Sequence, residues 1–231
     1  MRKTFFFFFI ICAHLTVNAQ DLHMKSIDNL GKYPADLIIK LAPLSLIDFK
    51  QSLQVAVEYK IKPRTTFQNE IGYINNLLNL YTYDDYRNMK GLRTRFEIRF
   101  YQKNFFDYVS GFYIAPEIFY VYTNYQRIGE LGRGCLAGRC DYFERKKFTV
   151  HKDVFGYHFK VGYQRIANDR ILFDFYGGAG LRHVFIHSPD TETEQDFFNE
   201  QSDLDPLRPY NNGTFLRPSF SLGMKIGYLL K

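Results

Sequence analysis

Tryptophan is absent from this 231-residue sequence, and beyond its first residues no continuous apolar run is long enough to cross a membrane as a helix. Such a helix needs about 20 predominantly apolar residues, so the sequence excludes a helical membrane protein. Tyrosine and phenylalanine are instead abundant, with 18 and 24 copies. Aromatic residues favour β-strands, and in membrane barrels they also form girdles at the two interfaces. The mean hydropathy of -0.29 is compatible with a barrel in which half of each strand is polar.

Cysteine is also scarce, with three copies. Cys12 follows Ile11, where a lipid-attachment site would have Ala or Gly, so we do not expect lipidation there. Cys135 and Cys140 bracket a short Gly-containing loop, which in an oxidising compartment favours a disulfide. A metal site would need two further ligands at suitable spacing, and none is near. Free thiols and a metal site are the less favoured alternatives.

Residues 1–19 have the pattern of a secretory signal peptide. Arg2 and Lys3 form a basic start, an apolar run follows, and small residues ending at Ala19 provide a cleavage site before Gln20. The apolar run is too short to span a bilayer as a helix. We therefore expect an exported protein.

The remainder of the chain has the length of one domain. We expect a polar periplasmic lead-in at residues 20–34 and a barrel at residues 35–231. Removal of the signal peptide, with Arg2 and Lys3, would reduce the formal net charge from +6 to +4. Such mild basicity indicates neither nucleic acid nor any other particular partner.

The clearest strand pattern lies at residues 92–101. Every second residue from Leu92 to Phe100 is apolar or nearly so, and the positions between carry Arg93, Arg95, Glu97 and Arg99. Because successive side chains of a strand point to opposite faces, this segment has one apolar face and one charged face. In a soluble sheet the charged face would meet water, whereas in a transmembrane barrel it would face the lumen.

The same alternation predicts eight strands, at residues 36–47, 52–61, 65–74, 92–101, 108–124, 149–165, 170–187 and 214–228. The first is the weakest, because Pro43 interrupts it. Pro116 lies within the fifth strand, where its missing N–H leads us to expect a bulge. From the second strand onward, tight turns alternate with long loops, one of which carries the two cysteines. An even number of strands with this alternation predicts an all-β fold, an eight-stranded antiparallel up-and-down transmembrane β-barrel.

Alternation alone does not say which face is inside, and a soluble lipocalin-like barrel would bury the aromatic face. The charged face also carries many small residues, among them Gly72, Gly156, Gly162, Gly178, Gly180, Gly223 and Gly227. Glycine costs stability in a strand unless close packing requires it. We therefore expect the glycines to line a narrow lumen and make room for long Arg, Lys and Glu side chains, with the large aromatic residues all facing lipid.

Three segments carry a resemblance to a known family: Glu58-Tyr59-Lys60, the stretch from Phe173 to Leu181, and the closing stretch from Ser221 to Tyr228. On these the chain resembles the small eight-stranded outer-membrane barrels of Gram-negative bacteria, OmpA-like and OmpW-like, and most of all the porin-family-like barrels of the Bacteroidota. The resemblance implies an outer-membrane location and insertion by the barrel-assembly machinery through the last strand. It brings no catalytic residues.

The predicted lumen is strongly charged. Its expected ion network comprises Glu58, Glu70, Arg93, Arg95, Glu97, Arg99, Glu117, Asp174 and Arg182, and Lys40, Lys60, Lys160 and Lys225 also point inward by parity. Eight strands enclose only enough room for side chains to fill, and buried charges must be paired. We therefore favour a plugged lumen over a conducting pore.

Two further features bear on function. His183 and His187 lie on the outward face near the end of the seventh strand, while Ser188 points the other way, so no local Ser–His pair supports a lipid hydrolase. The loop at residues 188–207 is acidic and lacks a calcium-binding pattern, whereas the cysteine loop is rich in Arg and Lys. These loops should be spatial neighbours that pair with each other, bind ionic groups of lipopolysaccharide, or form a solvated surface.

The sequence thus predicts an outer-membrane barrel of structural or binding role, without catalytic activity or cofactor. Its expected contacts are outer-membrane lipid and lipopolysaccharide, the barrel-assembly machinery during biogenesis, and an envelope protein partner. The alternatives are an outer-leaflet lipid-modifying enzyme, or a docking or narrow-passage subunit of an envelope complex.

Overall fold

The computed structural model describes residues 37–47, 50–62, 64–75, 87–102, 110–136, 139–168, 170–188, 197–199 and 213–230. The predicted signal peptide and lead-in, at residues 1–19 and 20–34, lie outside the described residues. No helix among the described residues is long and apolar enough to cross a membrane.

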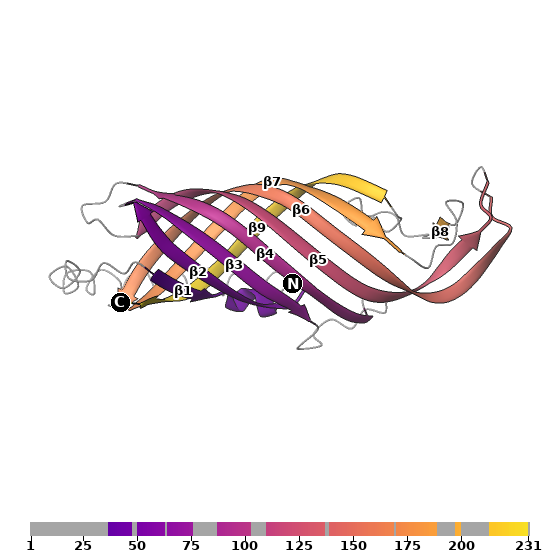
Figure 1. The fold of residues 1–231 in the computed structure, drawn as a ribbon, viewed down its shortest axis with the longest axis horizontal. Coiled ribbons are helices and arrows are strands. Elements are labelled where there is room, and N and C mark those ends of the chain that lie inside the picture. Colours follow the sequence, from indigo (N-terminus) through magenta and orange to yellow (C-terminus); the bar gives the residue numbers. More distant parts are fainter. Residues whose placement is uncertain are drawn as a thin grey trace, which may run out of the picture.

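The described chain consists almost entirely of antiparallel strands (Figure 1). Their bounds are β1 Leu37–Leu41, β2 Ser52–Lys62, β3 Thr65–Asn75, β4 Arg87–Tyr101, β5 Gly111–Arg133, β6 Tyr142–Asn168, β7 Ile171–His187, β8 Phe197–Asn199 and β9 Gly213–Leu230, with a short 3-10 helix, η2, at Pro43–Leu46. The strand order is β4-β3-β2-β1-β9-β7-β6-β5, and a β4–β5 pairing closes the ring. Eight strands therefore form a closed up-and-down barrel, which confirms the predicted fold class.

The first strand is shorter than predicted. Residues 36–47 were expected to form one strand, but β1 ends at Leu41 and the chain turns into η2 at Pro43. Proline removes a ladder donor and suits the first turn of a helix, which explains the early end. Within β1 the alternation is regular, because Ile38 and Lys40 are buried and their neighbours are exposed.

Pro116 does not create the expected bulge. The β4–β5 register runs from Glu97↔Glu117 to Phe100↔Ile114 without a shift, and Pro116 pairs with Phe159 of β6. The ladder between β4 and β5 simply lacks the two intervening pairs. The strand therefore tolerates the missing N–H locally, without inserting a residue.

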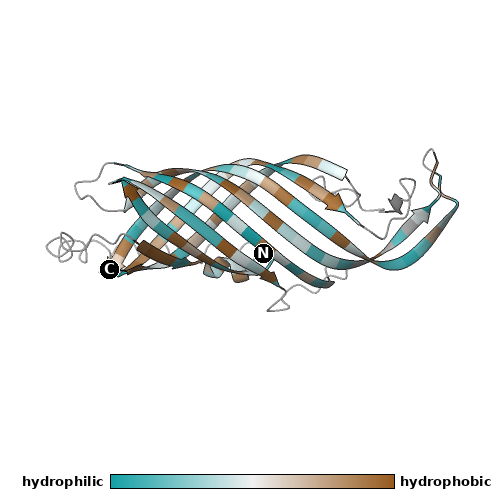
Figure 2. Ribbon diagram, viewed as in Figure 1, coloured by the Kyte–Doolittle hydropathy of each residue, from teal (hydrophilic) through white to brown (hydrophobic). Residues whose placement is uncertain are grey.

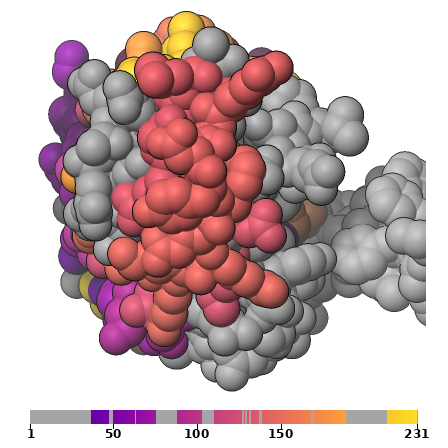
Figure 3. Space-filling model, turned by 90° about the vertical axis from the view of Figure 1, so that its right-hand side faces the viewer, coloured from indigo at the N-terminus to yellow at the C-terminus, as the bar shows by residue number. Residues whose placement is uncertain are grey.

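The predicted cysteine loop is largely strand. Strands β5 and β6 remain paired out to Arg133↔Tyr142, so a long hairpin projects from one end of the barrel (Figure 1). Its tip crosses the middle of the molecule when that end is viewed face on (Figure 3). Strand β8, which was not predicted, pairs with Glu130 to Gly132 on this hairpin. Part of the predicted acidic loop therefore lies beside the hairpin that carries the cysteines, in agreement with the expectation that the two loops are neighbours. Most of the acidic loop lies outside the described residues.

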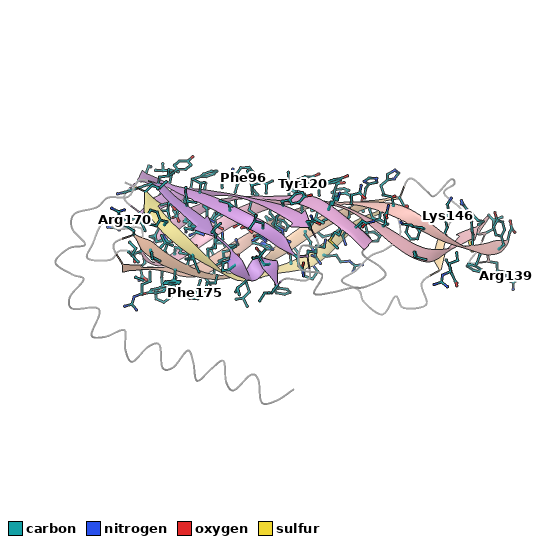
Figure 4. The ribbon with its side chains drawn as sticks, turned by 90° about the horizontal axis from the view of Figure 1, so that it is seen from below. Phe96, Tyr120, Arg139, Lys146, Arg170 and Phe175 are labelled. Atoms are coloured by element: carbon teal, nitrogen blue, oxygen red, sulfur yellow. A yellow bond between two sulfur atoms is a disulfide. The ribbon has the colours of Figure 1, made fainter. Side chains whose placement is uncertain are left out.

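Side chains alternate between the two faces of the barrel wall, and hydropathy alternates along each strand (Figure 2). Phe96 and Tyr120 point outward on one side of the barrel and Phe175 on the opposite side, and Arg170 lies at the end opposite Arg139 and Lys146 of the hairpin (Figure 4).

The expectation that all large aromatic residues face outward is wrong. Tyr101, Tyr113, Phe119, Tyr125, Phe148 and Tyr176 are buried inside. Several inner-face glycines make room for these rings rather than for charged chains: a Cβ on Gly162 would lie 2.3 Å from Tyr113 Cζ, and one on Gly223 would lie 2.4 Å from the Tyr176 hydroxyl. A narrow barrel fills its interior with whichever large side chains fit opposite small ones.

Candidate functional site: the charged interior and its cavity

A four-residue ion cluster ties together β1, β2, β4 and β7 inside the barrel. Lys40 Nζ lies 3.0 Å from Asp174 Oδ2 and also contacts Glu58, while Arg99 Nη1 lies 2.7 Å from Asp174 Oδ2 and 3.4 Å from Glu58 Oε2. All four side chains are fully buried. Because each cation contacts both carboxylates, no charge in the cluster depends on a single partner.

Two tyrosines complete the hydrogen bonding of this cluster. The Tyr113 hydroxyl donates to Asp174 Oδ1 at 2.7 Å, and the Tyr101 hydroxyl donates to Glu58 Oε1 at 2.8 Å. The Arg99 guanidinium also lies 4.4 Å from the Tyr113 ring centroid. Buried carboxylates are stable only when their oxygens are satisfied in this way.

A second cluster centres on Lys160 of β6. Lys160 Nζ lies 3.0 Å from Glu97 Oε2 and also contacts Glu117, and Glu97 in turn contacts Arg99 of the first cluster. His158 Nδ1 donates to Glu117 Oε1 at 2.9 Å, and its Nε2 lies 2.8 Å from Ser219 Oγ of β9. This network links strands that are far apart in the ring.

Glu70 holds the third group of charges. Lys225 Nζ lies 2.5 Å from Glu70 Oε2, and Arg95 Nε lies 3.5 Å from Glu70 Oε1. In the amide orientation that satisfies its neighbours, Gln54 donates to Glu70 Oε1 at 2.7 Å and accepts from Arg93 Nη1 at 2.8 Å. Each of the five inner carboxylates thus has a cation within 3.5 Å.

The structure places the nine predicted network residues in two groups. The carboxylates and Arg99 are fully buried, and Lys40, Lys160 and Lys225 supply cations beside them. Arg93, Arg95 and Arg182 instead line a cavity next to the ion pairs. Lys60 is half-buried near a turn.

Sequence reasoning missed the neutral partners. Alternation placed His158 and Gln164 on the inner face, but gave no sign that they would bridge charges; Gln164 accepts from Arg99 Nη1 at 3.1 Å. Tyr101 and Tyr113 were missed because aromatic residues were assigned to the outside. Strict parity with Phe100 and Phe112 would have placed both tyrosines inside.

Two apolar clusters flank the charges along the barrel axis. One lies towards the turn end and includes Ile38, Leu172 and Leu229, while the other lies towards the hairpin end and includes Ile74, Tyr125, Phe148, Val150 and Ile186. The described interior is therefore layered, with charges between two apolar zones.

A cavity of about 560 Å³ lies beside the ion pairs. Five basic side chains line it, and no Asp or Glu is among its described lining: the basic residues are Lys50, Arg93, Arg95, Lys152 and Arg182. Leu44, Ile47, Phe220 and Leu222 line it on the side of η2 and β9, and Phe119, Val121 and Val154 add apolar surface inside the barrel. The cavity thus joins an apolar mouth to an inner wall that is partly basic and partly apolar.

Other predicted sites are placed as follows. Cys135 and Cys140 form a disulfide at the hairpin tip. Ser188 is buried and donates to the Thr149 carbonyl oxygen at 2.9 Å, whereas His187 is exposed on the other face, so these two side chains are not brought together. Among the described residues no group of three or more His, Cys, Asp or Glu side chains could hold a metal ion.

Comparisons with known proteins find a structural likeness but no sequence match. No family model and no curated protein matches the sequence. Among solved structures, the fold is similar to the N-terminal β-barrel domain of Pseudomonas aeruginosa OprF, at 9% identity and a TM-score of 0.33, covering 83% of this chain and 95% of that one. The barrel architecture described above rests on this chain's own strand pairing.

Proposed function

We propose that this chain is an outer-membrane β-barrel with a plugged, ion-paired lumen and a structural or binding role, without catalytic activity. One observation carries the membrane placement: exposed apolar residues stand directly beside fully buried cations along the wall. Ile39, Ile98 and Phe159 are 39%, 40% and 58% exposed, while Lys40, Arg99 and Lys160, which follow them, are 0% exposed. A water-soluble barrel has the opposite polarity, and lysine and arginine are almost never fully buried there unless paired.

The layered interior supports the plug. Ion pairs cross the barrel, from Arg99 of β4 to Asp174 of β7 and from Lys225 of β9 to Glu70 of β3, and an apolar cluster lies on each side of them. Eight strands leave only enough room for side chains. A continuous water path would need these contacts to separate, which would leave charged side chains unpaired in a low-dielectric interior.

The orientation follows from the connections. The tight turns between β2 and β3 and between β6 and β7 lie at one end, and the long hairpin lies at the other. Outer-membrane barrels have short periplasmic turns and longer outer loops, so the hairpin end faces outward. In this placement the wall contacts lipid and lipopolysaccharide, the barrel-assembly machinery inserts the chain, and the projecting hairpin is the surface for an envelope partner.

The test is cell fractionation combined with electrophoresis. We expect the protein in the outer-membrane fraction, with a folded form that migrates differently before and after boiling. Recovery of the folded protein from the periplasm without detergent would contradict the proposal.

A further inference from the structure

The barrel wall has an opening beside β9. Strand β1 pairs only with Ile226 to Leu230 of β9, because it ends at Leu41. The preceding thirteen residues of β9, from Gly213 to Lys225, pair with β7 on one side and with no described strand on the other. Among the described residues, the edge of β9 that faces η2 is therefore without a paired strand over this stretch.

Prolines mark both sides of this opening. Pro43 ends β1 and starts η2, and Pro218 lies within the free part of β9. Proline lacks the N–H that a central strand needs, so it occurs mainly on edge strands and at bulges. The sequence is thus suited to leaving this edge without a partner.

Exposure of β9 side chains agrees with an open edge. Phe220 is 81% exposed and Leu222 is 90% exposed, compared with 63% for Phe112, the next most exposed apolar side chain of the barrel wall. Across the β7 ladder these two residues face only Ala179 and Gly177. The β7 side thus provides no large neighbour, and both apolar side chains are exposed at the mouth of the opening.

The cavity of about 560 Å³ connects this mouth to the barrel interior, because both groups of residues line it. Leu44 and Ile47 lie on the η2 side and Phe220 and Leu222 on the β9 side, while Arg93 and Arg95 belong to β4 on another part of the wall. A volume of roughly 300–1,000 Å³ is typical of small-ligand pockets. The cavity is therefore large enough for one chain of an amphiphile.

The inner wall of the cavity carries positive charge beside the apolar Phe119, Val121 and Val154. Arg182 lies directly opposite Arg217 in the β7–β9 ladder, and like charges in such a pair repel. Lys50, Arg93 and Lys152 also line this wall, as does Arg95, which pairs with Glu70, and no carboxylate is among the described lining residues. Guanidinium groups bind carboxylates and phosphates through paired N–H donors. The wall is thus complementary to an anionic head group.

The geometry points to a lateral binding site for an acyl chain that bears an anionic head group. The chain enters between η2 and β9 and lies against Leu44, Ile47, Phe220 and Leu222, and its carboxylate or phosphate reaches Arg93, Arg95 and Arg182. Strand β1 covers only the half of β9 near the turn end, so the opening lies in the half near the hairpin end. In the proposed membrane placement that half lies in the outer leaflet, from which the amphiphile comes, and to this extent the inference rests on the proposed function.

The experiment measures equilibrium binding of radiolabelled palmitate, lysophosphatidate and hexadecanol to the full-length mature protein in nanodiscs. We expect saturable binding of palmitate, of lysophosphatidate, or of both, and no saturable binding of neutral hexadecanol. Palmitate alone would identify a free fatty acid as the source of the anion, and lysophosphatidate alone would identify a phospholipid. Absence of saturable binding for both anions, or equal binding of hexadecanol, would overturn the inference.

Variants locate the site. Arg93→Gln combined with Arg182→Gln should weaken binding about tenfold or more, since each removes a charge-assisted contact. Arg170→Gln, at the opposite end of the barrel, is the matched control and should leave binding unchanged (Figure 4). Ser221→Phe should abolish binding by filling the cavity, whereas Thr214→Phe, on the exposed outer face of β9, should not.

Heat-modifiable migration of every variant separates the two proposals. If the variant without Arg93 and Arg182 folds, enters the membrane fraction and still binds as well as the unmodified protein, the binding site alone is overturned. A protein that never enters the membrane fraction overturns the proposed function instead. Should Ser221→Phe fail to fold, the arginine variants still decide the site.

Discussion

At the residue scale, this barrel depends on buried charges that have more than one partner. Glu97 contacts Arg99 and Lys160 and accepts from Gln68 at 3.1 Å. Alternation in the sequence was enough to place Glu97 inside, because a period of two fixes the face of every residue in a strand. It did not identify which cation each carboxylate would meet, because partners on other strands depend on barrel register and tilt.

Glu97→Ala should strongly destabilise the folded barrel. The substitution leaves Lys160 and Arg99 partly uncompensated inside the wall, and breaking a buried pair costs about 3–5 kcal/mol. Thermal unfolding in detergent is the measurement. Glu144→Ala is the control, because Glu144 is 44% exposed and its pair with Arg133 spans 3.5 Å, so about 0–1 kcal/mol is expected there. Equal shifts for the two variants would contradict the importance of the ion pairs.

Two glycines in the wall should respond differently to substitution by alanine. A Cβ on Gly162 would lie 2.3 Å from Tyr113 Cζ, and Tyr113 is held by Asp174, so Gly162→Ala should cost about 1–3 kcal/mol by overpacking. A Cβ on Gly177 would meet only Leu222 Cδ1, at 3.7 Å, so Gly177→Ala should be neutral or slightly stabilising. Denaturant unfolding of both variants in detergent measures the difference, and a neutral Gly162→Ala would show that the inner face is loosely packed.

At the element scale, the sequence predicted the wall well and the projecting hairpin poorly. Residues 125–133 and 142–148 lack regular alternation, yet all of them are paired in β5 and β6. Alternation arises where one face of a strand is apolar and the other polar. A hairpin that extends beyond the barrel is not held between lipid and lumen, so neither face is under that constraint. The five-residue β1 shows the reverse case: residues 36–47 were predicted as one strand, the weakest of the eight, and the strand ends at Leu41 because Pro43 interrupts pairing.

The boundary between wall and hairpin can be tested with arginine on β6. Phe159→Arg should impair assembly, since a lipid-facing arginine near the midplane costs about 2–4 kcal/mol. Phe143→Arg is the matched control, because Phe143 is similarly exposed, at 52% against 58%, but lies on the projecting part of the same strand. The yield of heat-modifiable protein in the membrane fraction is the measurement. Equal tolerance of both substitutions would mean that the outer face of β6 does not contact lipid.

At the scale of the whole molecule, the barrel presents its apolar residues to the surroundings and keeps its charges inside, in contact with each other. The lateral cavity does not alter this arrangement, because it opens through the side of the wall and its inner end meets the ion pairs of Glu70 and Glu117 through Arg95 and His158. A site for an amphiphile and an axial plug are therefore compatible in one barrel.

The protein should not conduct ions. An axial path would have to pass the apolar cluster around Leu172 and Leu229, then the Lys40–Asp174–Arg99 pairs, and then the cluster around Phe148 and Ile186. Opening such a path requires several buried pairs to separate at once, each at a cost of about 3–5 kcal/mol, so open states are vanishingly rare. Planar-bilayer recording of the purified, heat-modifiable protein should show no sustained channel. Stable, reproducible conductance would refute the plug and favour a narrow passage through the barrel instead.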